Sequence, residues 1–246
     1  MRNALITGAN KGIGFAAARR LGGSGVEVLI GARDPEKGEE AAALLRAEGI
    51  DAEAVRIDVT DPAGVRAAAA QVKERHGHLD ILVNNAGVLP EATAAEQVEG
   101  PMDLRMFRTT FDTNVFGAVA VTEAFLPLLS AAPAGRIVNV SSTMGSLADQ
   151  TDPDSGYYGM IVPAYQSSKA ALNSITIALS KALADTPVKV NAVCPGWVKT
   201  DLGGPDNKAA APMTPDEGAA IVTQMALVGA DGPTGGFFDR SGPVRW

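Results

Sequence analysis

Short apolar runs and helical stretches alternate along the whole chain. The apolar runs fall at 4–6, 26–30, 54–57, 81–83, 136–140 and 188–193. Helical patterns fill the intervals at 12–22, 35–48, 62–75, 103–129, 165–184 and 216–228, and a last short strand is expected at 236–238. This alternation is typical of a parallel sheet covered by helices on both faces. We therefore expect an α/β, doubly wound parallel sheet of about seven strands.

The helix starts and the absence of a linker give the domain organisation. Pro35 and Pro62 stand at first helical positions, where a missing N–H costs nothing, and Asp61 is expected to cap the helix at 62–75. No Pro/Ser-rich linker or composition shift divides the chain. We expect one domain over residues 1–246.

Composition and charge exclude several classes of protein. The chain has 21 Lys+Arg against 28 Asp+Glu, a net charge of −7, which argues against a nucleic-acid binder. One Cys and two His leave little for a disulfide framework or a metal site, so we expect no metal. No uninterrupted apolar run predicts a membrane span, and no signal-peptide core follows Met1. A cytoplasmic enzyme is expected.

Three glycines follow the first apolar run and open a helical stretch. They are Gly8, Gly12 and Gly14, within the segment 7–14. A pyrophosphate sits against exposed N–H groups at a helix N-terminus, where side chains would block its approach. The spacing is G-x-x-x-G-x-G rather than the common G-x-G-x-x-G. The segment is predicted to bind a dinucleotide.

The end of the second apolar run indicates which dinucleotide. An NAD site places a carboxylate there for the ribose 2′-OH, whereas an NADP site uses a cation for the 2′-phosphate. Gly31 stands where the acid is expected, Arg33 follows, and Lys11 lies in the glycine-rich segment. These residues favour NADP(H). Asp34 would serve as the acid if the register shifted by a few residues.

Tyr165 and Lys169 form a Y-x-x-x-K pair on a predicted helix. Residues four apart share one helix face. A nearby ammonium lowers the pKa of a tyrosine, which can then exchange a proton with a carbonyl or alcohol oxygen. The pair alone is a common pattern and does not establish an active site.

Further motifs occur in a fixed order around this pair. They are Asn84-Asn85-Ala86-Gly87, Asn114, Ile137 to Ser142, and Pro195-Gly196. Together with the glycines and Tyr165-x-x-x-Lys169, they make the chain resemble the short-chain dehydrogenase/reductase family from residue 3 to about residue 200. Four stretches resemble its NADPH-dependent carbonyl reductase branch: Gly8 to Gly14, Ala32-Arg33-Asp34, Cys194 to Asp201, and the final Trp246. The resemblance implies a Rossmann-type fold.

The resemblance also implies roles for four catalytic residues. Tyr165 would donate the proton in reduction, and Lys169 would lower its pKa and bond the nicotinamide ribose. Ser142 would orient the substrate carbonyl, with Ser141 as the alternative if the register is off by one. Asn114 would hold a water in a proton relay behind Lys169.

The cofactor contacts implied by the resemblance follow several strands. Phosphates would meet the glycine-rich segment, the adenine part would lie near the residues after the third and fourth strands, and nicotinamide would lie beside the residues after the sixth. The predicted contacts are Gly8, Asn10, Lys11, Gly12, Ile13, Gly14, Arg33, Asp58, Val59, Asn85, Ala86, Gly87, Tyr165, Lys169, Pro195, Gly196, Val198 and Thr200.

Three variable segments are expected to form the substrate region: about 90–101, 143–164 and 201–215. The segment 143–164 is polar and turn-rich, and we expect Tyr157 and Tyr158 to line the substrate pocket. Its length is intermediate between compact family members and monomeric carbonyl reductases, so monomer or homo-oligomer stays undecided. The resemblance implies that the segment 201–215 is a mobile lid over the substrate.

These observations predict an NADPH-dependent reductase of ketones or aldehydes, with a small-molecule carbonyl or alcohol as substrate and neither nucleic acid nor membrane as partner. An alternative is an NAD(P)-dependent alcohol dehydrogenase working in the oxidative direction. A non-catalytic nucleotide sensor is a third possibility, which the full set of catalytic residue types disfavours. The sequence does not identify the substrate.

Overall fold

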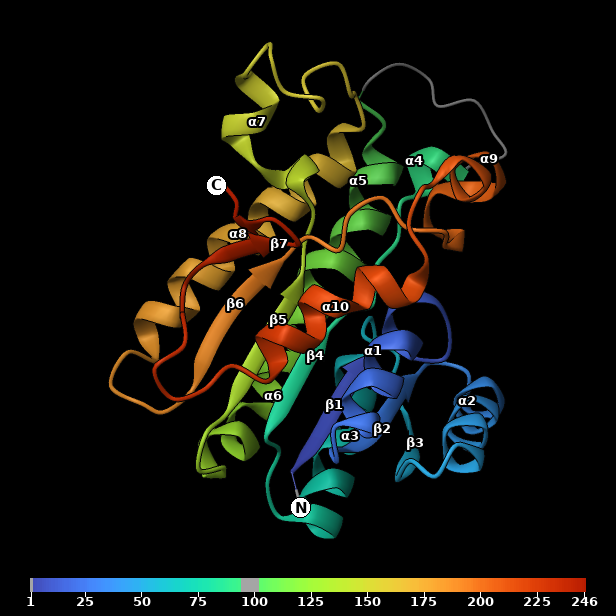
Figure 1. Ribbon diagram of the computed structural model, residues 1–246, viewed down its shortest axis with the longest axis vertical. Helices are drawn as coiled ribbons and strands as arrows, with labels where there is room; N and C mark the ends of the chain where they lie inside the picture. The colour runs from blue at the N-terminus through green and yellow to red at the C-terminus, as the bar shows by residue number, and fades with distance from the viewer. Residues whose placement is uncertain (1, 94–101) are drawn as a thin grey trace.

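A central sheet of eight strands organises the computed structural model, which describes residues 2–93 and 102–246 (Figure 1). The strand order is β3-β2-β1-β4-β5-β6-β7-β8, parallel except for the β7–β8 pair. The strands are β1 (Asn3–Thr7), β2 (Glu27–Ala32), β3 (Ala52–Arg56), β4 (Ile81–Asn84), β5 (Arg136–Val140), β6 (Lys189–Val193), β7 (Phe237–Asp239) and β8 (Gly242–Pro243). The parallel, Rossmann-type sheet is as predicted, with the short antiparallel β8 added at its edge.

Helices cover both faces of the sheet. The long ones are α1 (Gly12–Gly23), α2 (Pro35–Ala47), α3 (Pro62–His76), α5 (Leu104–Phe111), α6 (Ala118–Ala131), α8 (Pro163–Ala182) and α10 (Pro215–Ala226). The largest apolar core cluster draws on α1, α2 and α10, and the second on α3 and α6, with Leu179 of α8 packed against it. A small third cluster joins Ala192, Cys194 and Phe237. The predicted layers are therefore confirmed.

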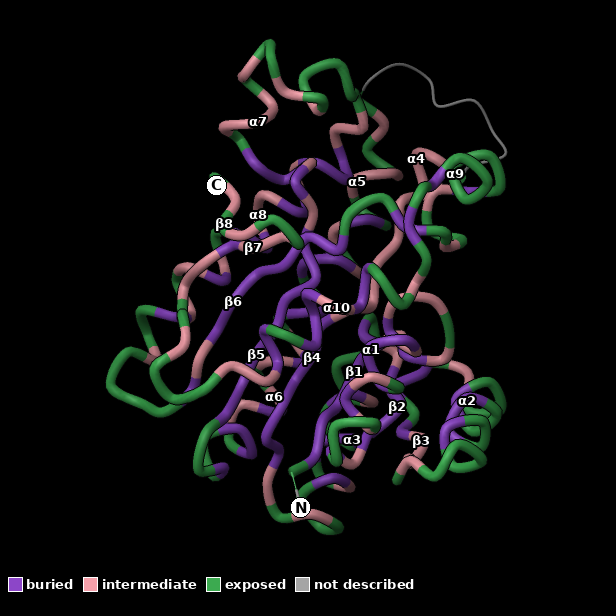
Figure 2. The backbone as a smooth tube through the Cα atoms, in the orientation of Figure 1, coloured by how far each residue is buried: buried purple, intermediate pink, exposed green. Residues whose placement is uncertain are grey.

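Alternate residues of the central strands β1, β2, β4 and β5 enter the two larger cores. In β1, Ala4 and Ile6 belong to one cluster, while Leu5 between them belongs to the other. Such strands read as continuous apolar runs because both of their faces are buried. Figure 2 shows the central strands largely buried, whereas the edge strands β3 and β8 are only partly buried and exposure is concentrated in the outer helices and connections.

Two acidic side chains cap helices next to proline. Asp61 accepts a hydrogen bond from Ala63 N at 3.1 Å and begins α3, as predicted. Asp34 begins α2 and accepts from Glu36 N and Lys37 N. Each cap satisfies first-turn N–H groups that lack partners within the helix.

The predicted helix at 103–129 consists of three joined parts. The α5 helix passes into a π-helix over Asp112–Gly117, here called η1, which passes into α6. By length and composition alone, Leu104–Ala131 is apolar enough to cross a membrane. Its Val121, Phe125, Leu128 and Leu129 are buried in the second core cluster. These four side chains fix one face of α6 to the core.

Short helices occupy the three predicted substrate segments. They are α4 (Pro90–Thr93), η2 (Thr143–Gly145), α7 (Leu147–Thr151), η3 (Asp201–Gly203) and α9 (Gly204–Ala210). Residues 94–101 of the first segment lie outside the described part of the chain. Figure 1 places α4, α7 and α9 beyond the carboxyl ends of the parallel strands, where open α/β sheets bind ligands.

Candidate active site

Helix α8 brings Tyr165 and Lys169 into one buried site. Both side chains are 5% exposed. The Lys169 Nζ lies 5.5 Å from the centre of the Tyr165 ring and donates a hydrogen bond of 2.8 Å to the backbone O of Val140. Tyr165 and Lys169 thus lie together at the carboxyl end of β5.

Burial controls the pKa values of this pair. It raises the pKa of Tyr165 far above its usual value, and the hydrogen bond from Ser142 offsets only part of that rise. Burial lowers the pKa of Lys169 to about 8. Both shifts follow from the cost of placing a charge in a low-dielectric interior. For Tyr165 the direction is opposite to the sequence expectation, because burial dominates the pKa and the Lys169 ammonium is bound to Val140 O.

The two serines after β5 point to different partners. Ser142 hydrogen-bonds the Tyr165 side chain, and its Oγ accepts from Met144 N at 3.2 Å. Ser141 is 2% exposed, and its Oγ donates to Asn173 Oδ1 at 2.6 Å. Ser142 therefore lies at the tyrosine, while Ser141 is committed to the interior.

Asn114 lies in η1 and is 1% exposed. Its Oδ1 accepts from Val88 N at 2.8 Å, and its Nδ2 donates to Val88 O at 3.0 Å and to Ser168 Oγ at 3.1 Å. These bonds use both ends of the amide side chain. Asn114 thereby joins the segment after β4 to α8, beside Tyr165.

The glycine-rich segment packs tightly against the turn after β4. A Cβ on Gly14 would lie 2.6 Å from Gly8 O, and Gly8 itself has a φ of +64°. Asn85 Nδ2 donates to Gly8 O at 3.2 Å, and Thr7 Oγ1 accepts from Asn85 N and Ala86 N. No side chain fits in this cradle, which matches the need of a dinucleotide phosphate for close backbone approach.

Lys11 connects this segment to the turn after β6. Its Nζ lies 2.7 Å from Asp201 Oδ2, and Lys208 Nζ lies 2.8 Å from Asp201 Oδ1. The two ammonium groups hold the pKa of Asp201 at about 2. Gly12 faces Thr200 across the same space. The predicted phosphate and nicotinamide segments are thus brought together.

The remaining predicted cofactor residues lie at the carboxyl ends of the parallel strands and differ in how far they are buried. Asn10, Ile13, Asp58 and Gly87 are half-buried, Pro195 and Val198 are buried, and Gly196 is exposed. Val59 is 8% exposed and belongs to the second core cluster, so its side chain packs mainly inward.

The end of β2 carries no carboxylate free for a ribose. A Cβ on Gly31 would lie 2.8 Å from Ile6 O, which leaves no room for an acidic side chain. Asp34 is used as the cap of α2 and also pairs with Lys37 at 3.5 Å. Arg33 is exposed, and its charge contributes to lowering the pKa of Asp58, for which Thr60 is the main cause. Arg33 is therefore an exposed cation at the end of β2.

Tyr157 and Tyr158 differ in their surroundings. Tyr157 hydrogen-bonds Thr143, and burial raises its pKa, whereas Tyr158 is 54% exposed. The chain's last residues hold their segment: Arg245 pairs with Asp149 and Asp152 at 2.9 Å each, and Trp246 O accepts from Ala148 N. That these tyrosines line a substrate pocket stays a prediction.

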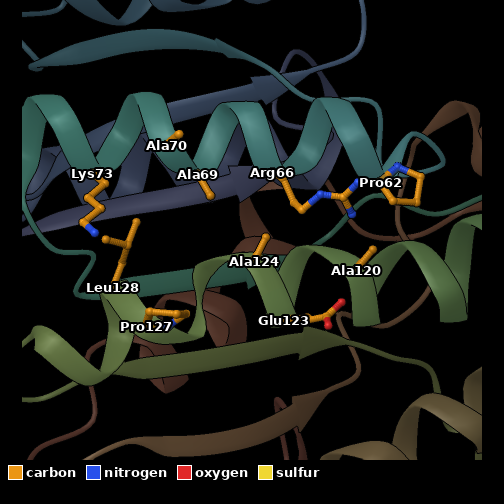
Figure 3. A pocket seen from close by; sticks show the side chains of 10 residues that line it. All are labelled: Pro62, Arg66, Ala69, Ala70, Lys73, Ala120, Glu123, Ala124, Pro127 and Leu128. Atoms are coloured by element: carbon orange, nitrogen blue, oxygen red, sulfur yellow. The ribbon is translucent and has the colours of Figure 1, made fainter.

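A surface groove of about 370 Å³ lies between α3 and α6 (Figure 3). Pro62, Arg66 and Lys73 line it from α3, with Glu123 and Pro127 from α6. None of its lining residues belongs to the predicted site. The groove is therefore distinct from the cluster around Tyr165.

Two residues that the sequence analysis did not single out contact the site. They are Asp201, the partner of Lys11, and Glu91, whose carboxylate accepts from Tyr165 N at 2.8 Å. An acidic residue directly after Val198-Lys199-Thr200 was a visible signal for Asp201. No local pattern pointed to Glu91. Among residues 2–93 and 102–246, no cluster of His, Cys, Asp or Glu is suited to a metal.

Comparisons with known proteins match this arrangement. A family model described as short chain dehydrogenase matches residues 2–211. Short-chain dehydrogenase anuI of Penicillium roqueforti is 37% identical, over 92% of this chain and 88% of its own. Carbonyl reductase (NADPH) 1 of Sus scrofa is 32% identical, over 100% of this chain and 94% of its own.

A solved structure agrees with these sequence matches. The NADPH-bound carbonyl reductase from chicken fatty liver superposes with a TM-score of 0.83 at 30% identity, covering 100% of this chain and 99% of that one. The match extends over the sheet, the glycine-rich segment and α8. The chain belongs to the short-chain dehydrogenase/reductase family.

Proposed function

We propose that the protein reduces a ketone or aldehyde to an alcohol with NADPH. The observation that carries the proposal is the buried Tyr165 phenol, hydrogen-bonded by Ser142 and flanked by Lys169. The carbonyl reductases among its relatives support the same reaction. The enzyme is an oxidoreductase acting on CH–OH and C=O groups, and we place it in the cytoplasm.

The fit of the site favours the phosphorylated cofactor. The cradle at Gly8 and Gly14 suits a pyrophosphate, and exposed Arg33 suits a 2′-phosphate. A ribose-binding carboxylate has no place at Gly31, and Asp34 is engaged as a helix cap. When bound, the nicotinamide supplies the hydride that the carbonyl carbon receives.

The chain's own residues supply the proton and the orientation. Ser142 donates a hydrogen bond to the carbonyl oxygen, and Tyr165 gives its phenolic proton to the same oxygen. Burial raises the pKa of Tyr165, which keeps it protonated at neutral pH, the state that reduction needs. Lys169, with a pKa of about 8, can return a proton to the tyrosine near neutral pH. Asn114 holds the segment behind this pair through Val88 and Ser168.

The test is NADPH consumption across a panel of aldehydes, quinones, β-ketoesters and cyclic ketones. The proposal expects turnover of at least one class, with NADPH preferred to NADH. Turnover only in the oxidative direction with NAD would replace it by the dehydrogenase alternative. Binding of NADPH without oxidation by any carbonyl would contradict it.

A further inference from the structure

Helix α8 starts without a side-chain cap of its own. Val162 stands at the N-cap position, where its side chain offers no acceptor, and Pro163 follows at the first helical position. The next two N–H groups are those of Ala164 and Tyr165. In the first turn of a helix these groups have no partner within the helix. The start of the helix that carries Tyr165 therefore depends on an acceptor from elsewhere.

Glu91 supplies that acceptor from a distant part of the chain. Its Oε1 accepts from Ala164 N at 3.0 Å, and its Oε2 accepts from Tyr165 N at 2.8 Å. Hydrogen bonds to an ionised acceptor are roughly twice as strong as neutral ones. A negative charge at a helix N-terminus is also favoured by the helix dipole. One carboxylate thus holds both free N–H groups, including that of the proposed proton donor.

The backbone of Tyr165 is held at its carbonyl as well. Ser168 Oγ donates to Tyr165 O at 2.7 Å and accepts from Asn114 Nδ2 at 3.1 Å. The same Asn114 binds both backbone polar groups of Val88, three residues before Glu91. The segment 88–91 is therefore fixed to η1 at one end and to Tyr165 at the other.

We propose that Glu91 is a positioning residue for the proton transfer: its carboxylate fixes the backbone of Tyr165, so that the phenol meets the substrate oxygen and Ser142 together. This inference rests on the proposed function. Misplacement of a reacting group by about 1 Å can cost about 100-fold in rate. Loss of the carboxylate should slow proton transfer while leaving the phosphate cradle at Gly8 and Gly14 unchanged.

The test compares Glu91→Ala and Glu91→Gln with Glu217→Gln. Glu217 is a matched control, because its carboxylate caps α10 through Thr214 N at 2.7 Å and Thr214 Oγ1 at 2.9 Å. Each capping substitution should lower the melting temperature by about 1–8 °C. Thermal denaturation measures that loss, kcat and KM measure turnover, and fluorescence titration gives the Kd for NADPH.

We expect kcat to fall about 10- to 100-fold in Glu91→Ala, and less in Glu91→Gln, which keeps one carbonyl acceptor. The Kd for NADPH should stay within about twofold, because the cradle is untouched. The solvent deuterium isotope effect on kcat should rise, since proton transfer becomes slower relative to the other steps. Glu217→Gln should lose similar stability with kcat and isotope effect unchanged.

Several outcomes would overturn the inference. One is a kcat within about twofold of wild type in both Glu91 variants. Another is an equal loss of kcat in Glu217→Gln, which would show that reduced stability alone is responsible. If Glu91→Ala fails to fold, Glu91→Gln alone decides. If the wild type turns over, Tyr165→Phe abolishes that turnover and the Glu91 variants are unaffected, only the role of Glu91 is rejected. If the wild type itself shows no turnover, the proposed function is rejected as well.

Discussion

The ammonium of Lys169 lies 5.5 Å from the centre of the Tyr165 ring and is bound to the carbonyl of Val140, not to the phenol. Both groups are buried, and burial moves their pKa values in opposite directions, up for Tyr165 and down to about 8 for Lys169. At neutral pH the pair holds a protonated phenol beside a charged amine. This state suits proton donation to a carbonyl oxygen.

Lys169→Met should change the pH dependence of stability. Below pH 8 the folded and unfolded states both carry the Lys169 proton, and burial of that charge destabilises the fold. Between pH 8 and 10.5 only the unfolded state keeps it, so the wild-type fold gains stability as pH rises. The variant's advantage in free energy of unfolding should therefore shrink across this window, as measured by urea denaturation.

Lys181→Met is the control for this comparison, because Lys181 is exposed near the end of the same helix. It removes a lysine charge that is not buried, so the difference between the two variants isolates the effect of burial. If this difference does not change with pH, burial does not lower the pKa of Lys169 in the folded protein.

Substitution of Ser142 should mainly lower activity, whereas substitution of Ser141 should mainly lower stability. Ser142→Ala removes the hydroxyl at Tyr165 and should lower kcat about 100-fold or more, the usual effect of losing one donor at a reacting oxygen. Ser141→Ala leaves the buried Asn173 acceptor unpaired and should cost about 1–3 kcal/mol of stability with little change in kcat. Steady-state kinetics and urea denaturation measure the two effects. The reverse pattern would exchange the assigned roles of the serines.

Arg33→Ala should impair the use of NADPH and spare that of NADH. A hydrogen-bonded charge contact is worth about 1.5–3 kcal/mol, so KM for NADPH should rise about 10- to 100-fold. Lys37→Ala is the control, because Lys37 is paired with Asp34 in the first turn of α2. Initial rates with both cofactors measure the effect. Equal losses with NADH and NADPH would show that Arg33 does not recognise the 2′-phosphate.

Much of the fold could be predicted from local sequence. The buried strands β1 and β4 contain short apolar runs, and Asp61 next to Pro62 marks a helix start. Their signals depend on residues close in sequence, where periodicity and capping act. The motif order likewise identified Ser142, Tyr165 and Lys169, which the fold brings together.

Contacts between distant segments could not be predicted in this way. Glu91 and Tyr165 are joined across 74 residues, and Lys11 and Asp201 across 190. The π-helical turn at Asn114 and the short helices α7 and α9 also lack a strong periodic signal. The raised pKa of Tyr165 depends on burial and on where Lys169 points, and neither follows from a four-residue spacing.

The most direct test of the central claim is the turnover of Tyr165→Phe with NADPH and a carbonyl that the wild type reduces. The substitution removes only the phenolic oxygen, so NADPH should bind with a Kd within about twofold of wild type while kcat falls about 100- to 10,000-fold. Fluorescence titration and NADPH oxidation measure the two quantities on one preparation. A variant that binds NADPH and keeps near-normal kcat would contradict the assignment of Tyr165 as proton donor.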